Sequence, residues 1–123
     1  MNFREGQPIY LQIAERVMDE ILADQYKADE RVPGVRDYSV LLQVNVNTIV
    51  KAFDILTTRG ILYNKRGLGS FVAPEAKDII HQTRREEVLN QQLPELARNM
   101  QQLNIPIDCV TSRLERILTA SQN

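Results

Sequence analysis

The chain has 123 residues, of which 43% are hydrophobic and 25% are charged, which is typical of one globular domain and excludes collagen-like and disordered classes. Its apolar runs are too short to span a membrane, no apolar stretch predicts a secretory signal, and the single cysteine excludes an internal disulfide. We therefore expect a cytoplasmic protein with no membrane partner.

The net charge of −1 conceals an uneven distribution along the chain. Residues 1–30 carry a net charge of −4, residues 31–72 carry +4, and residues 73–123 carry −1. A basic middle segment between acidic flanks predicts a local surface that faces phosphate groups. Chance clustering on a solvated face is the alternative interpretation.

The first half of the chain predicts an amphipathic helix after Pro8 and a short second helix after Gly34. In both segments apolar residues recur at three- and four-residue steps. The inward residues of the first helix are Leu11, Ala14, Val17, Met18, Ile21 and Leu22, and its polar face is Gln12, Glu15, Arg16, Asp19 and Glu20. The inward residues of the second helix are Val35, Tyr38, Leu41 and Leu42.

A third helix is predicted between Asn45, a favoured N-cap residue, and Gly60, which permits a left-handed C-terminal stop. Its buried stripe consists of Ile49, Ala52, Phe53 and Leu56. Because only a tight turn separates the second and third helices, the pair is predicted to form a helix-turn-helix.

The hydrophobic period changes after Gly60 and predicts two strands, at residues 61–64 and 70–72. Gly67 and Gly69 permit the positive φ angles of the loop between them. A hairpin directly behind the third helix is a wing. The Ala73-Pro74-Glu75 segment marks the predicted boundary between a winged helix-turn-helix domain, residues 1–73, and a helical region, residues 74–123.

The helical region carries an apolar stripe that resembles a coiled-coil seam. Pro94 predicts either a kink or the first position of a new helix, and the Asn104-Ile105-Pro106 segment breaks the chain again. So short a region cannot enclose its own core, which favours packing on a second copy; folding back onto the first helix is the alternative. The predicted dimer interface is Leu89, Leu93, Leu96, Met100, Leu103, Val110, Leu114 and Ile117.

The outward face of the third helix has the residue types that read DNA. With the stripe inward, the residues that point away are Val46, Asn47, Val50, Lys51 and Asp54. In a recognition helix Asn47 would bond adenine and the two valines would contact thymine methyl groups. Thr48 would reach phosphate or base, and Lys51, further along, would meet phosphate. An ordinary solvated face is the alternative, although two exposed valines are unusual without a partner.

Other basic residues fit the same surface. Arg36 lies in the first turn of the second helix, and Lys65 and Arg66 lie at the tip of the wing. The alternatives are a surface ion pair of Arg36 with Asp37 or Glu30, and a purely solubilising role for the wing tip.

Nothing in the sequence predicts an enzyme, a metal site or a cofactor. The single histidine, His81, is expected to be solvated, and Cys109 is expected to be a small buried apolar group. The two are far apart in sequence and do not have metal-ligand spacing.

Several motifs occur in a characteristic order: Pro8-Ile9-Tyr10-Leu11-Gln12-Ile13, Arg31-Val32-Pro33-Gly34-Val35-Arg36-Asp37, Val44-Asn45-Val46-Asn47-Thr48-Ile49-Val50-Lys51-Ala52-Phe53, Gly60-Ile61-Leu62 and Gly67-Leu68-Gly69-Ser70-Phe71-Val72. Over residues 8–72 this order and spacing resemble the DNA-binding domain of the GntR family of bacterial transcription regulators. The start of the third helix and the short helical tail resemble the YtrA-like subfamily, whose members dimerise through the tail and typically repress their own operons, often with transporter genes.

The resemblance implies DNA contacts by Arg36, by Asn45, Asn47 and Thr48, and by the wing glycine Gly67 with Arg66 beside it. Val46 and Val50 stand where many relatives carry arginine, which favours thymine contact over guanine readout. Gln43 replaces a common turn glycine, and Pro33-Gly34 replaces the usual proline-serine.

The sequence thus predicts a mainly α fold: an N-terminal winged helix-turn-helix of three helices and a β-hairpin, followed by a short helical dimerisation tail. The expected function is a homodimeric regulator, more readily a repressor than an activator, bound to an inverted-repeat operator in double-stranded DNA. A winged-helix module that binds protein is the alternative. The sequence identifies no small-molecule effector.

Overall fold

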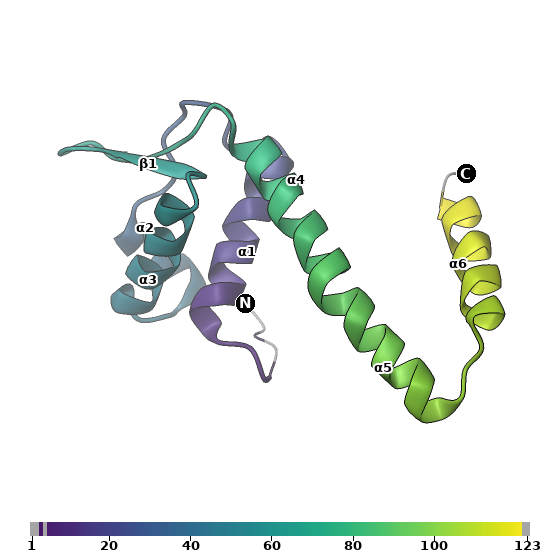
Figure 1. Cartoon of the computed structure of the whole chain (residues 1–123). Coiled ribbons are helices and arrows are strands. Elements are labelled where there is room, and N and C mark those ends of the chain that lie inside the picture. Colours follow the sequence, from purple (N-terminus) through teal and green to yellow (C-terminus); the bar gives the residue numbers. More distant parts are fainter. Residues whose placement is uncertain (1–2, 4, 122–123) are drawn as a thin grey trace. The chain divides into compact units, whose positions relative to one another are not determined.

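The computed structural model describes residue 3 and residues 5–121 and is mostly helical (Figure 1). The chain forms two compact units, one reaching to Thr83 and the other beginning at Arg84. Helix α4 (Ala76–Glu87) runs through this division. No helix within the described residues combines the length and apolar character needed to cross a membrane.

Helix α1 (Ile9–Leu22) buries one face, as predicted from its periodicity. Ala14, Val17, Met18 and Ile21 of the predicted face are buried, Leu11 and Leu22 are half-buried, and Ile13, which was not assigned to that face, is buried as well. The prediction for Gln12 was wrong: this side chain is only 4% exposed and does not belong to the polar face. Its Nε2 atom donates to the backbone oxygen of Gln7 at 2.9 Å, so the buried amide keeps a hydrogen bond.

Helices α2 (Val35–Leu42) and α3 (Val46–Thr58) form the predicted helix-turn-helix. The turn between them places Gln43 at φ 55°, the left-handed region that glycine favours. Ser39 stabilises this turn, because its Oγ atom donates to the Val44 oxygen at 2.6 Å while its own carbonyl accepts from the Val44 N–H at 3.2 Å. The turn therefore closes without the glycine that is common there.

The inward face of α2 is narrower than the sequence predicted. Tyr38 and Leu42 are buried and Val35 is half-buried, but Leu41 is 63% exposed. Leu41 lies beside the buried stripe of this two-turn helix instead of on it, so its inward assignment was wrong.

The core of the first unit gathers around Tyr38. The Tyr38 ring packs edge-on against Phe53, with 5.7 Å between ring centroids. Its hydroxyl donates to Glu20 Oε1 at 2.8 Å. Burial is the main cause that raises the pKa of Tyr38, and the hydrogen bonds to Tyr26 and Glu20 raise it further. Strong packing and a satisfied hydroxyl thus connect α1, α2 and α3.

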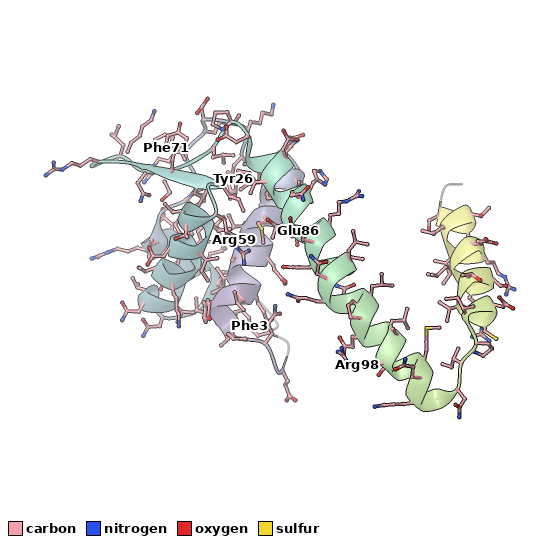
Figure 2. The ribbon with its side chains drawn as sticks, in the orientation of Figure 1. Phe3, Tyr26, Arg59, Phe71, Glu86 and Arg98 are labelled. Carbon is pink, nitrogen blue, oxygen red and sulfur yellow. The ribbon has the colours of Figure 1, made fainter. Side chains whose placement is uncertain are left out.

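Strands β1 (Leu62–Lys65) and β2 (Gly69–Val72) form an antiparallel hairpin whose loop projects away from the helices (Figure 1). The strand ends agree with the prediction to within a residue or so. Gly67 and Gly69 have φ angles of +78° and +107°, and Gly60 has +80° after α3. On the hairpin, Tyr63 stacks on Phe71 with 5.8 Å between ring centroids. Figure 2 shows Phe71 on this hairpin.

The second unit continues from α4 through a π-helical segment, η1 (Val88–Gln92), into α5 (Leu93–Leu103) and then α6 (Ile107–Ser121). Pro94 is the second residue of α5, and the backbone before it is helical through η1, so Pro94 does not begin a new helix. Asn104 ends helix α5 with a φ of 55°, in the left-handed region. No residue from 84 to 121 is buried.

An apolar groove of about 950 Å³ lies between α5 and α6 and is lined by Leu93, Leu96, Ala97, Met100, Gln101, Asn104, Ile105, Pro106, Ile107, Val110, Thr111 and Leu114. Five of these residues belong to the predicted dimer interface. Cys109 is exposed, so its prediction as a buried group was wrong. Two helices alone cannot enclose a side chain on every side.

Candidate nucleic-acid interface

The outward face of α3 is the one predicted from the periodicity. Ile49, Ala52, Phe53 and Leu56 are buried on the opposite side. Val46 and Val50 are 39% and 38% exposed. The polar residues of the same face, Asn47, Lys51 and Asp54, are also exposed. An exposed amide between two exposed valines therefore faces solvent on the first two turns of the helix.

Asn45 fixes the first turn of this helix. Its Oδ1 atom accepts the backbone N–H of Asn47 at 2.8 Å, as expected of an N-cap. The backbone oxygen of Asn45 accepts the N–H of Thr48 at 3.0 Å, and Thr48 is half-buried. Because the Asn45 side chain holds the cap, the side chain of Asn47 remains the exposed amide of this turn.

Lys51 is held at its position by α1. Its Nζ atom lies 4.2 Å from the centroid of the Tyr10 ring, within the range of a cation–π interaction. The contact limits the freedom of the lysine but does not neutralise its charge.

The tip of the wing is exposed and basic. Lys65, Arg66 and Gly67 are all exposed. The loop is closed by the Leu68 N–H, which donates to the Lys65 oxygen at 2.9 Å. The Lys65 Nζ atom lies 4.5 Å from the centroid of the Phe71 ring, so the ammonium group forms a cation–π contact with strand β2.

Arg36 is exposed in the first turn of α2 and forms no ion pair within the part of the chain that the structure describes. Both candidate acidic partners are engaged elsewhere. Asp37 Oδ2 accepts the Gly34 N–H at 3.3 Å at the start of α2, and Glu30 Oε1 accepts the Lys27 N–H at 2.8 Å. The charge of Arg36 is therefore available to an external anion.

The profile of the bacterial regulatory proteins of the gntR family matches residues 9–72, just over half of the chain. The chain belongs to the GntR family.

Solved structures of GntR regulators extend the similarity beyond that domain. One from Bacteroides thetaiotaomicron, assigned to the same family, is 38% identical with a TM-score of 0.78, covering 94% of this chain and 99% of its own. A GntR family transcriptional regulator from Listeria monocytogenes is 27% identical with a TM-score of 0.74, covering 93% and 98%. The winged helix and the helical tail are thus both found in this family.

Curated GntR relatives match over shorter stretches. The uncharacterized HTH-type transcriptional regulator YhcF of Bacillus subtilis is 32% identical over 62% of this chain and 63% of its own length. The HTH-type transcriptional repressor YtrA of the same organism is 32% identical over 60% and 57%. The match therefore spans only about three fifths of these two relatives.

One residue near the GntR wing was not singled out from the sequence. Arg31 belongs to the Arg31–Asp37 motif but had no predicted role, yet its Nε atom donates to the Leu68 oxygen at 2.8 Å. The two residues lie 37 positions apart, so no local pattern indicates the contact.

The described residues show no group of three His, Cys, Asp or Glu side chains that could hold a metal ion. His81 is exposed, as predicted. The predicted site residues that are exposed include cations, the amides of Asn45 and Asn47, and two valines. These groups suit phosphate contact and base contact.

Proposed function

We propose that this protein is a sequence-specific regulator of transcription that binds double-stranded DNA as a homodimer, most simply as a repressor. The observation that carries the proposal is the exposed face of α3, where Asn47 lies between Val46 and Val50 without being covered by the first unit. Exposed cations on α2 and on the wing supply the attraction to phosphate.

The proposed recognition follows from the chemistry of each group. Asn47 donates to and accepts from an adenine edge in the major groove, and the two valines pack on thymine methyl groups. Asn45 and Thr48 contact the DNA from the cap and the first turn of α3, and Lys51 contacts a phosphate further along the helix. This division of roles gives sequence readout to α3 and leaves affinity mainly to the cations.

The proposed backbone contacts come from two further elements. Arg36 presents an uncompensated charge at the start of α2, and Lys65 and Arg66 present theirs at the tip of the wing. Gly67 has no atom within 4 Å of the position of a Cβ, so the wing tip is open enough to approach a groove. A wing beside the recognition helix would then lie over the neighbouring minor groove.

The proposed dimer is formed by the tail, residues 74–123, with residues 1–73 as the DNA-binding domain. Leu103 and Ile117 are 69% and 60% exposed, and no residue from 84 to 121 is buried. An uncovered apolar face of this kind is typical of an interface between subunits. The proposed contacts are Leu89, Leu93, Leu96, Met100, Leu103, Val110, Leu114 and Ile117.

Relatives support the DNA partner and the repressor role. The DNA-binding domain of AraR, 28% identical over 58% of this chain with a TM-score of 0.55, has been solved in complex with an operator. YtrA is a transcriptional repressor by name. Similarity to the YtrA-like subfamily extends the proposal to repression of the protein's own operon, with transporter genes among the candidates.

A footprint on the DNA upstream of the protein's own gene tests the proposal. The full chain is expected to protect a stretch with an inverted repeat, since two identical subunits read two identical half-sites. The affinity should fall steeply as the salt concentration rises. Absence of any protected stretch, together with duplex affinity that is absent or independent of salt, would contradict the proposal and favour a protein-binding module.

A further inference from the structure

We propose that Arg31 is a positioning residue for DNA binding, which fixes the tip of the wing so that Lys65 and Arg66 meet the DNA backbone together with α3. The inference deepens the proposed function and rests on it. Arg31 itself is exposed, but its contacts are directed at the protein and not at solvent alone.

The backbone around Arg31 is anchored to the wing. Arg31 forms an antiparallel bridge with Phe71. On either side of it, the Val32 N–H donates to the Ser70 oxygen at 3.0 Å and the Val72 N–H donates to the Glu30 oxygen at 3.0 Å. The segment before α2 therefore pairs with β2 through a single bridge outside the two-stranded sheet, and the base of the Arg31 side chain has a fixed position.

The side chain then extends to the far end of the same strand. Its Nε atom donates to the backbone oxygen of Leu68 at 2.8 Å, immediately before β2 begins. Leu68 also donates its N–H to Lys65, so it is the residue that closes the loop. A hydrogen bond from a charged donor to this residue restrains the loop more strongly than a neutral one.

Gly69 leaves room for the Arg31 side chain because it has no Cβ atom. A Cβ atom on Gly69 would lie 2.9 Å from Arg31 Nε and 3.4 Å from Nη2, whereas a Cβ on Gly67 would meet nothing within 4 Å. The arginine thus occupies the space beside Gly69. The position of a Cβ on Gly34, the N-cap residue of α2, is 3.8 Å from the same Nη2 atom. The guanidinium group therefore lies between the wing and the start of α2.

This placement explains how a hairpin with only two strands can present its cations in a defined direction. A two-stranded hairpin is marginal by itself, and its exposed loop would otherwise sample many positions. Ordering the loop before binding removes that entropic cost from the association with DNA. Arg31 is accordingly expected to act through Arg66, not independently of it.

A double-mutant cycle on the full chain tests this dependence. Duplex affinity is measured for the wild type, Arg31→Ala, Arg66→Ala and the double variant, using the duplex that the wild type protects. We expect the loss caused by Arg31→Ala to be at least about threefold smaller in the Arg66→Ala background than in the wild type, since coupled residues are not additive. Arg59→Ala, which removes a charge at the C-cap of α3, is the matched control and should combine independently with Arg66→Ala.

Hydrogen exchange of the Leu68 amide in the free protein supplies a readout that does not depend on DNA. We expect Arg31→Ala to accelerate this exchange while Arg59→Ala leaves it unchanged, with the same thermal unfolding midpoint in both variants. The role of Arg31 would be overturned if Arg31→Ala lowered the affinity by the same factor in the wild-type and Arg66→Ala backgrounds, or if the exchange of the Leu68 amide did not change. Failure of the wild type to bind duplex DNA would instead reject the proposed function. The exchange measurement distinguishes the two failures, because it is made on the free protein.

Discussion

The Lys51 ammonium nitrogen lies 4.2 Å from the centroid of the Tyr10 ring, so a residue of α1 fixes a cation on the outward face of α3. Tyr10 is the second residue of α1 and is half-buried, whereas Lys51 is exposed. The surface proposed to face DNA thus depends on a helix that does not itself belong to the helix-turn-helix.

Replacing Tyr10 with leucine should therefore weaken DNA binding through Lys51. An exposed cation–π contact contributes about 0.5–1 kcal/mol, which predicts a loss of about two- to fivefold in affinity. Tyr10→Phe keeps the ring and should bind like the wild type. Equal losses in both variants, measured by fluorescence anisotropy on one duplex, would show that the hydroxyl and not the ring matters.

Replacing Arg66 with alanine should change the salt dependence of binding. A cation that neutralises one phosphate contributes about 0.9 to the slope of log affinity against log salt concentration, so the slope should become shallower by about that amount. The loss should be uniform across DNA sequences. Arg59→Ala removes the same charge at the C-cap of α3 and not on the wing, and a slope change of the same size in that variant would assign the effect to net charge.

Replacing Tyr38 with phenylalanine should change the stability of the protein at high pH. The pKa of Tyr38 is raised by burial first and by its hydrogen bonds second, so the folded protein keeps the proton that the unfolded chain loses near pH 10. The stability conferred by this hydroxyl is fully present below pH 10 and declines above it, by up to about 1.4 kcal/mol per pH unit.

Urea unfolding at a fixed protein concentration measures this effect. The wild type should exceed Tyr38→Phe by about 1 kcal/mol at neutral pH, since the variant lacks the hydrogen bond to Glu20. The difference should shrink between pH 10 and pH 11. If the difference in unfolding free energy between the two proteins stayed constant over that range, Tyr38 would have the same pKa in the folded and unfolded states.

Placing a charge in the groove between α5 and α6 should disrupt self-association. Leu114 lines this groove, and a carboxylate there opposes burial against a second copy. Leu114→Glu should sediment as a monomer and lose affinity for an inverted repeat while keeping affinity for a half-site. Ser112→Glu adds the same charge on α6 outside the groove and should remain dimeric; the same oligomeric state in both variants would argue against a tail interface.

The local elements were predictable because their signals are local. Asn45 as a cap and Gly60 as a stop fixed both ends of α3, and the two wing glycines fixed the hairpin. Each of these residues acts on the backbone within a few positions of itself. The outward face of α3 followed from its caps and its periodicity, so most of the candidate site was predictable as well.

The errors concern contacts that periodicity does not encode. Gln12 is buried because the Gln7 carbonyl provides a partner for its amide, and Leu41 is exposed because a helix of two turns buries only a narrow stripe. Arg31 reaches a carbonyl 37 residues away, which only the folded chain brings near. Cys109 is exposed because few other elements of the second unit surround α6.

The central claim is that the exposed face of α3 reads base sequence in double-stranded DNA. Selection of duplexes from a random library by the wild type and by Asn47→Ala, carried out in parallel, tests it most directly. We expect both proteins to enrich an inverted repeat, with one position of each half-site losing its preference in the variant, at a cost of about 1–3 kcal/mol on the wild-type site. Identical base preferences in the two proteins, or no enriched sequence in either, would contradict the claim.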